Sequence, residues 1–228
     1  IKLEEQERLL LHARMEALQN QINPHFLFNT LNSISSLVRF DPDTAREVIS
    51  KLATILRRLL NNTDSFVPLR EEVEFIDNYL DIEVVRFGND KLRVVKELAA
   101  DSLDMMVPSM LLQPLVENSI KHGLASKVEG GSIHLRSRLS DSGLVIEVED
   151  DGVGMAATQM PEAGSARGTG IGMANISERL QVLYGDTARM TIDSHEGKGT
   201  LVRIRLPLLQ TAGAVPAGFY EERSTTRR

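Results

Sequence analysis

Four polar side chains that could take part in chemistry fall within one predicted helix, Ser109–Gly123. They are Glu117, Asn118, Lys121 and His122, and at about 100° per residue they lie close together on its polar side. An asparagine oxygen can hold Mg²⁺, and a lysine one turn later can meet a phosphate. A surface helix that ends at a glycine cap accounts for the same residues, because helical spacing creates polar faces freely.

Two glycine-containing clusters follow this helix. Asp150 ends an apolar run, with Gly152 and Gly154 after it. A carboxylate there can accept a hydrogen bond from an amine, and the glycines let the backbone approach a flat ring. An ordinary Asp-Gly turn has the same residues.

The second cluster leads into a helix predicted from Met173, so its backbone N–H groups can meet a phosphate. Its residues are Gly168, Thr169, Gly170, Ile171 and Gly172. It is not a Walker loop, because no Gly-Lys-Ser or Gly-Lys-Thr closes it. A dinucleotide motif is disfavoured too, because the cluster does not follow a strand within a βαβ unit.

His25 lies in the most unusual stretch, Asn23-Pro24-His25-Phe26-Leu27-Phe28-Asn29. An exposed imidazole that is partly neutral at pH 7 can act as a nucleophile. A solvated surface histidine is the plainer interpretation. The expected exposure of Phe26 and Phe28 argues against it, because exposed phenylalanines need a reason such as docking on another domain.

The N-terminal helical region positions His25. Residues 1–38 predict a long helix whose apolar stripe changes side at Pro24, where a helix kinks or restarts. The stripe after Pro24 consists of Leu27, Leu31, Ile34 and Val38. His25 lies opposite this stripe, so we expect it to face outward.

A second helix begins after the turn signal Asp41-Pro42-Asp43. Its expected inner face consists of Val48, Leu52, Ile55 or Leu56, and Leu59. Two such helices expose much apolar surface, so pairing with a second copy as a dimeric four-helix bundle is expected.

The rest of the sequence, from Leu69 onward, predicts further helices together with strands, so the expected fold class of the chain is α+β. A third helix is expected over Leu69–Phe87 and another over Met173–Leu183. The expected strands are Leu92–Glu97, Ser132–Leu139, Leu144–Glu149, Arg189–Ile192 and Thr200–Leu206. Short turns between them predict antiparallel hairpins in an α/β sandwich. The predicted parts are a helical region (1–65), an α/β domain (66–209) and a disordered tail (210–228).

Composition excludes several classes of function. The 228 residues carry a net charge of −6, which argues against a nucleic-acid binder. There is no cysteine, so disulfides and thiolate metal sites are excluded. No apolar run is long enough to cross a bilayer. Because the chain opens within a charged helical pattern without an initiator Met, we expect it to be part of a longer protein.

Taken in chain order, the helix with Asn118, the Asp150 cluster and the Gly168–Gly172 cluster resemble the ATP-binding domain shared by gyrase, Hsp90 and the histidine kinases. This domain has the Bergerat or GHKL fold. The resemblance covers about residues 69–208. It implies that Asn118 chelates Mg²⁺, that Asp150 bonds the adenine amine of ATP, and that Gly168–Gly172 closes over the phosphates. Lys121 and Asn175 match positions near the nucleotide. Thr200, in the Gly-Lys-Gly-Thr turn, matches the last box of the family.

One departure discriminates within that superfamily. ATPase members carry a water-activating Glu one turn before the Mg²⁺-binding Asn, whereas Pro114 occupies that position here. Hydrolysis by that mechanism is therefore disfavoured. Phosphoryl transfer to a protein group, which needs mainly positioning and charge neutralisation, is favoured.

The acceptor region resembles the LytS/YehU-type sensor histidine kinases, through the box Gln21–Asn32. The likeness extends through Tyr79–Glu83 with Arg86-Phe87, Leu112–Asn118 and Asn175–Leu180. It implies autophosphorylation of His25 in a homodimer and transfer to an aspartate of a response regulator, often one with a LytTR domain. It also implies sensory or membrane segments upstream, so this chain would be the cytoplasmic portion of an inner-membrane-anchored bacterial protein.

More common histidine kinases place an acid directly after the acceptor, but Phe26 stands there. Our hypothesis is that Glu117 takes the proton instead. Two other functions remain open: a module that holds ATP as a switch without transfer, and a serine kinase of the anti-sigma-factor type. The latter leaves His25 and its helices unexplained.

Overall fold

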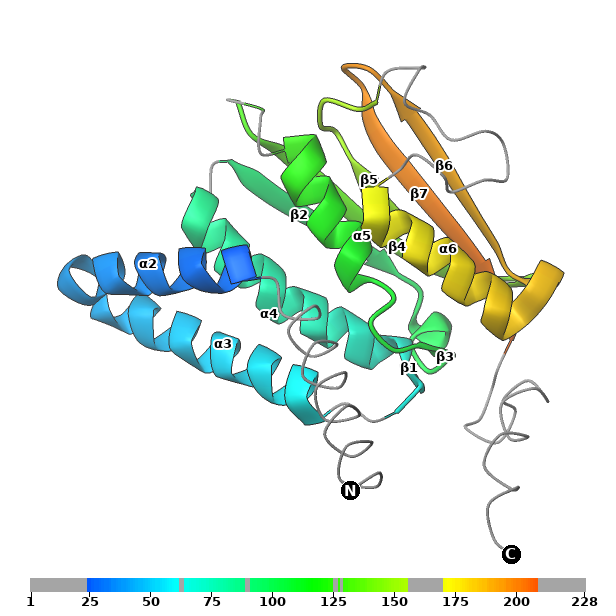
Figure 1. The fold of residues 1–228 in the computed structure, drawn as a ribbon, viewed down its shortest axis with the longest axis horizontal. Coiled ribbons are helices and arrows are strands. Elements are labelled where there is room, and N and C mark those ends of the chain that lie inside the picture. The colour runs from blue at the N-terminus through cyan, green and yellow to red at the C-terminus, as the bar shows by residue number, and fades with distance from the viewer. Residues whose placement is uncertain are drawn as a thin grey trace, which may run out of the picture. The chain divides into compact units, whose positions relative to one another are not determined.

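The structure, a computed structural model, describes residues 24–61, 64–88, 91–124, 127, 129–155 and 170–208 (Figure 1). The predicted helix before Pro24, the first two residues of the glycine cluster (Gly168 and Thr169) and the predicted tail therefore lie outside the described residues. The chain divides into two compact units, Ile1–Thr63 with Asp77–Gly88, and Asp64–Ile76 with Asn89–Arg228.

The first unit contains a helical hairpin, α2 (Pro24–Phe40) and α3 (Pro42–Asn61). Asp41 joins them and caps α3: its carboxylate accepts bonds from the Thr44 backbone N–H at 3.1 Å and the Thr44 hydroxyl at 2.7 Å. The Thr44 hydroxyl bond is the main cause that lowers the pKa of Asp41. The predicted helix start at Asp41-Pro42-Asp43 is confirmed.

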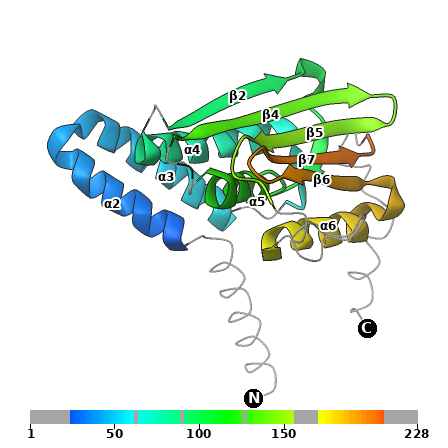
Figure 2. The ribbon, with the colours of Figure 1, turned by 90° about the horizontal axis from the view of Figure 1, so that it is seen from above.

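The inner face of α3 agrees with the sequence pattern, and Ile55 is the buried member of the Ile55/Leu56 alternative. Its buried side chains are Ala45, Val48, Leu52, Ile55 and Leu59. These side chains recur at helical spacing. The face that they form packs within the first unit, where α2 and α3 lie side by side (Figures 1 and 2).

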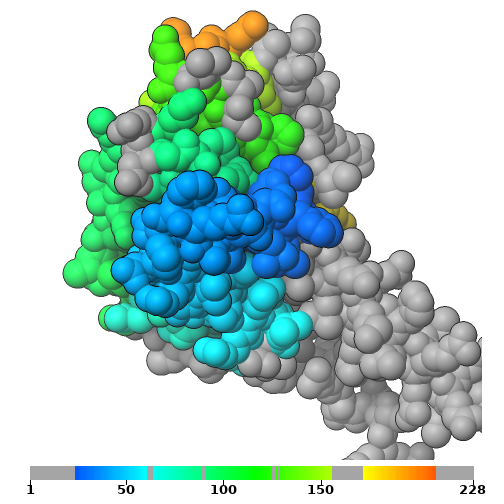
Figure 3. Space-filling view, turned by 90° about the vertical axis from the view of Figure 1, so that its left-hand side faces the viewer, coloured from blue at the N-terminus to red at the C-terminus, as the bar shows by residue number. Residues whose placement is uncertain are grey.

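The apolar stripe predicted for α2 is only partly buried within the single chain. Phe26, Thr30 and Ile34 are buried, whereas Leu31 is 46% and Val38 54% exposed. The reason is Tyr79, whose ring lies 4.6 Å from that of Phe26 and turns this side of α2 inward. Figure 3 shows the surface of α2 and α3, the helices that carry several exposed apolar side chains, among them Phe28, Leu31 and Val38.

Helix α4 (Leu69–Phe87) coincides with the predicted third helix. Its residues from Asp77 group with the first unit, and those before it with the second. In the first unit, Lys51 of α3 pairs with Asp81 at 2.6 Å. Apolar side chains on several sides of α4 are buried, including Leu69, Ile76 and Ile82. The buried residues of this helix therefore occupy more than one face.

The second unit is built on a five-stranded sheet in the order β2-β4-β5-β7-β6. The strands are β2 (Leu92–Leu98), β4 (Gly131–Ser140), β5 (Gly143–Asp150), β6 (Arg189–His195) and β7 (Gly199–Leu206). All five were predicted, and both hairpins, β4–β5 and β6–β7, are antiparallel as expected. Strand β2 runs parallel to β4.

Two short strands and two short 3-10 turns were not predicted. Strands β1 (Phe66–Pro68) and β3 (Met106–Pro108) pair with each other, and the turns are η1 (Ala100–Ser102) and η4 (Gly185–Thr187). Three residues are too few to show an alternating pattern.

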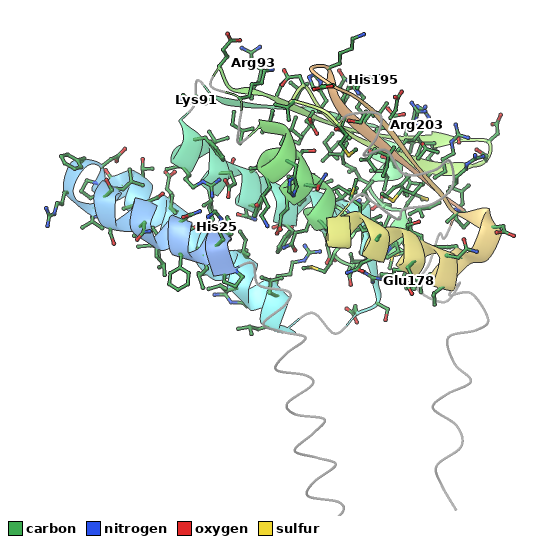
Figure 4. All side chains as sticks on the ribbon, turned by 45° about the horizontal axis from the view of Figure 1, so that its top comes forward. His25, Lys91, Arg93, Glu178, His195 and Arg203 are labelled. Atoms are coloured by element: carbon green, nitrogen blue, oxygen red, sulfur yellow. The ribbon has the colours of Figure 1, made fainter. Side chains whose placement is uncertain are left out.

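The two faces of the five-stranded sheet differ in chemistry. Helices α5 (Gln113–Asn118) and α6 (Gly170–Tyr184) lie on one face (Figure 2), toward which buried side chains such as Ile133, Ile146 and Ile204 point. The other face carries ion pairs, such as that of Arg203, labelled in Figure 4, with Glu147 at 2.5 Å. This alternation is that of a sheet covered on one side.

The predicted helix Ser109–Gly123 begins four residues later than expected. It consists of α5 and a π-helical turn, η2 (Ser119–Leu124). Met110 has a φ of 60°, which a helix cannot include. Within the described part of the chain, no helix combines the length and apolarity needed to cross a membrane.

Candidate nucleotide site and phosphoacceptor

Asp150 is the centre of the candidate nucleotide site. It ends β5 and is only 3% exposed. Its Oδ1 accepts a bond from the Gly152 backbone N–H at 3.0 Å, and the Ser119 hydroxyl and Thr200 backbone N–H donate to the same carboxylate. Burial raises the pKa of Asp150, and the three bonds oppose that shift.

Glycines bring the backbone unusually close to this carboxylate. A Cβ on Gly123 would lie 2.6 Å from Oδ1 of Asp150, and one on Gly152 would collide with the Gly123 backbone. The Val153 N–H donates to the Gly123 carbonyl at 3.0 Å, which fixes η2 against the segment after β5. Only glycine fits at both positions, so the sequence builds a narrow cradle around Asp150.

The β6–β7 turn closes the other side of this segment. Gly154 has a φ of +65°, and a Cβ there would meet the His195 carbonyl. The Gly197 N–H donates to the Val153 carbonyl at 2.7 Å. Thr200 is buried, and its hydroxyl lies 2.8 Å from that of Ser194. Asp150, Gly152, Gly154 and Thr200 thus belong to one connected structure.

The polar side of α5 and η2 brings some predicted residues together. Glu117 accepts a bond from the Gln113 side-chain amide at 2.8 Å, and Lys121 lies 3.7 Å from its other oxygen. Asn118 is partly exposed, and both Lys121 and His122 are exposed.

Helix α6 begins at Gly170, so the second half of the glycine cluster is helical. A Cβ on Gly172 would lie 3.9 Å from the Cβ of Pro114, which places this end of α6 beside α5. Asn175 is exposed on α6. Gly168 and Thr169 lie outside the described residues, and for Ile171 only the helical backbone is described.

The predicted phosphoacceptor, His25, is exposed on the first turn of α2 (Figure 4). The side-chain nitrogen of Asn29, one turn later, lies 3.2 Å from each ring nitrogen. The expectation that both neighbouring phenylalanines are exposed is wrong: Phe28 is 67% exposed, but Phe26 is buried against Tyr79.

Sequence reasoning missed Ser119, whose hydroxyl reaches Asp150. Its position directly after Asn118 was the available signal. A regular helix would not have predicted its direction, because η2 is a π-helical turn. In the described ranges, no three His, Asp or Glu side chains gather closely enough to hold a metal ion.

Two family models match the chain. Residues 13–92 match "Histidine kinase", and residues 106–210 match "Histidine kinase-, DNA gyrase B-, and HSP90-like ATPase". The second match includes the Asp150 cradle and implies that this region binds ATP.

Similar proteins include sensor protein LytS of Oceanobacillus iheyensis, which is 36% identical over 91% of this chain and 36% of its own length. Sensor histidine kinase BtsS of Escherichia coli K12 is 32% identical over 90% of this chain and 35% of its own length. LytS of Staphylococcus epidermidis RP62A is 34% identical, with 90% of this chain and 35% of its own covered. The chain therefore spans about a third of the length of these relatives.

The two family matches together span most of the chain, in the same order as the helical unit and the ATPase-like sheet unit. The relatives align across both matched regions. The chain belongs to the histidine kinase family, in the group of sensor kinases that includes LytS.

Proposed function

We propose that this chain is the catalytic portion of an ATP-dependent protein-histidine kinase, which phosphorylates His25 and passes the phosphoryl group to an aspartate of a response regulator. The observation that carries the proposal is the buried Asp150 carboxylate, held in a cradle of glycine backbone. A carboxylate is costly to bury, so a fold retains it where its charge or acceptor capacity is used.

In the proposed complex, Asp150 accepts a hydrogen bond from the adenine amine, and the backbone at Gly152 and Gly154 lets the ring approach. Lys121 and the N-terminal end of α6 at Gly170–Gly172 supply positive potential for the phosphates. Asn118 supplies one oxygen to Mg²⁺, an ion usually held by one or two protein ligands together with substrate phosphates. Bound Mg²⁺ would neutralise phosphate charge during transfer.

Pro114 favours transfer over hydrolysis, because it has no side chain that can activate water. A ring nitrogen of His25 donates its lone pair to the γ-phosphorus, and the bond from phosphorus to the bridging oxygen of ADP breaks. The other ring nitrogen loses its proton to a base. We propose Glu117 for that role, because Gln113 and Lys121 hold its carboxylate at the polar side of α5.

The whole protein is proposed to act as a homodimer. Phe28, Leu31 and Val38 expose apolar surface on the hairpin, which pairing in a four-helix bundle would bury. The proposed partner is a response regulator, with a LytTR domain as the specific candidate. By its likeness to LytS we also propose that this region is the cytoplasmic part of a membrane-anchored bacterial sensor.

The decisive experiment is incubation with γ-labelled ATP, with wild type beside His25→Gln and, as a control, His195→Gln, which changes another exposed histidine. We expect an acid-labile, base-stable label on wild type and the control, and none on His25→Gln. Equal labelling of all three would refute His25 as the acceptor. No label despite ATP binding would favour an ATP-dependent switch, and an acid-stable label on a partner would favour a serine kinase.

Glu117 needs its own test, because a base affects the rate of transfer and not the binding of nucleotide. We expect Glu117→Gln to bind ATP as wild type does and to label His25 far more slowly. Labelling at the full rate would eliminate Glu117 as the base.

A further inference from the structure

The segment Ser109–Leu112, just before α5, has an unusual backbone. Met110 has a φ of 60°, and it is the one non-glycine residue with a positive φ among those that the structure describes. This conformation is strained for an ordinary residue, so surrounding contacts must hold it. Because α5 begins at Gln113, the direction of this segment sets the position of the helix that carries Asn118.

Glu72 of α4 holds this segment from one side. Its carboxylate is almost completely buried, at 1% exposure. One oxygen accepts a bond from the Met110 N–H at 2.9 Å, and the other accepts bonds from the N–H groups of Leu111 at 2.8 Å and Leu112 at 3.1 Å. Three consecutive backbone donors therefore converge on one side chain that lies far away in the sequence.

Arg179 of α6 holds the same segment at its first residue, Ser109. Its Nη1 donates to the Ser109 carbonyl at 2.6 Å. Burial lowers the pKa of Arg179, and the charge of Glu72 opposes that shift, so the two side chains are close enough to interact electrically.

Helix capping alone does not require this arrangement. A Ser, Thr, Asp or Asn at the N-cap would satisfy the first N–H groups of α5 locally, but Leu112 stands there and makes no side-chain cap. Buried charges are also a poor source of stability, because apolar replacements often do as well. What the two charged groups supply is a fixed backbone direction at the start of α5.

We propose that Glu72 is a positioning residue for the nucleotide site, which with Arg179 clamps Ser109–Leu112 and so places Asn118 for Mg²⁺. The inference rests on the proposed nucleotide function. A positioning role for Glu72 differs from a purely structural role in one measurable respect. Loss of Glu72 must weaken nucleotide binding mainly when Mg²⁺ is present, because adenine recognition at Asp150 does not involve Glu72.

The test uses Glu72→Gln in the full chain, with Glu71→Gln as the matched control, because Glu71 is an exposed neighbour on the same helix. The amide keeps the shape of Glu72, but its NH₂ group faces a backbone N–H and cannot accept its bond. Affinity for ADP is measured with and without Mg²⁺, and unfolding by circular dichroism. We expect Glu72→Gln to be folded and to bind ADP at least about tenfold more weakly with Mg²⁺, with less than about threefold change without it.

Wild-type affinity in folded Glu72→Gln, or equal weakening with and without Mg²⁺, would overturn the inference. If Glu72→Gln does not fold, Arg179→Lys replaces it: the shorter-reaching ammonium keeps the charge but loses the bond to Ser109, and the same Mg²⁺-selective weakening is expected. An unchanged Arg179→Lys would then count against the clamp. Failure of the wild type to bind ADP would instead refute the proposed function, so the two failures are distinguishable.

Discussion

Replacing Gly123 by Ala tests the Asp150 cradle with a single methyl group. The added Cβ would lie 2.6 Å from Oδ1 and 2.9 Å from Cγ of Asp150, so the carboxylate must move. Overpacking of this kind costs about 1–3 kcal/mol of stability, which the better helical propensity of alanine offsets by about 0.5–1 kcal/mol. A displaced carboxylate also loses its bond to the adenine amine, which is worth about 2 kcal/mol, or about thirtyfold in Kd.

Gly185→Ala is the matched control. Gly185 has a φ of +57° and nothing within 4 Å of a Cβ, so alanine there costs about 1 kcal/mol through backbone strain alone. Urea unfolding and calorimetric titration with ADP would be run on both variants. We expect both to lose stability and only Gly123→Ala to lose affinity. Equal ADP affinity in the two variants would falsify the assignment of Gly123 and Asp150 to the adenine site.

Three further predictions follow from the described contacts. Burial raises the folded-state pKa of Asp150 above the ordinary 3.8, so the contribution of this carboxyl to stability falls as pH rises through that window; the stability of Asp150→Asn relative to wild type in urea unfolding should therefore be higher at pH 7 than at pH 3. Tyr184→Phe should stabilise the chain by about 1 kcal/mol in urea unfolding, because the hydroxyl is buried without a hydrogen-bond partner among the described residues. Arg136→Ala should lose about 1 kcal/mol or less, with ADP affinity unchanged, because its bonds to Glu97 at 3.0 Å and Glu149 at 2.5 Å are partly exposed to solvent. A large loss for Arg136→Ala, or destabilisation of Tyr184→Phe, would contradict these readings.

Elements with a long regular pattern could be predicted from the sequence. Helix α4 coincides with its predicted range, and β5 and β7 lie within one residue of theirs, because apolar residues recur at the helical or strand period and polar turns bound them. The Asp150 cluster could also be recognised, because its glycines and acid follow a strand directly.

The errors arise where a distant side chain decides local structure. The helix predicted from Ser109 starts at Gln113, and the N–H groups of Met110, Leu111 and Leu112 bond to Glu72 instead of a capping side chain nearby. The inward side of α2 was misassigned at its first turn because Phe26 packs on Tyr79. Neither partner lies within the window from which a helical period is read.

Both of these distant partners belong to α4, and this gives that helix a particular importance. Tyr79 lies in the part of α4 that groups with the first unit, and it fixes the turn of α2 that carries His25. Glu72 lies in the part that groups with the second unit, and it fixes the start of the helix that carries Asn118. The sequence of α4 therefore sets the local geometry of the phosphoacceptor and of the candidate Mg²⁺ ligand, although α4 contains none of the residues proposed to take part in the reaction.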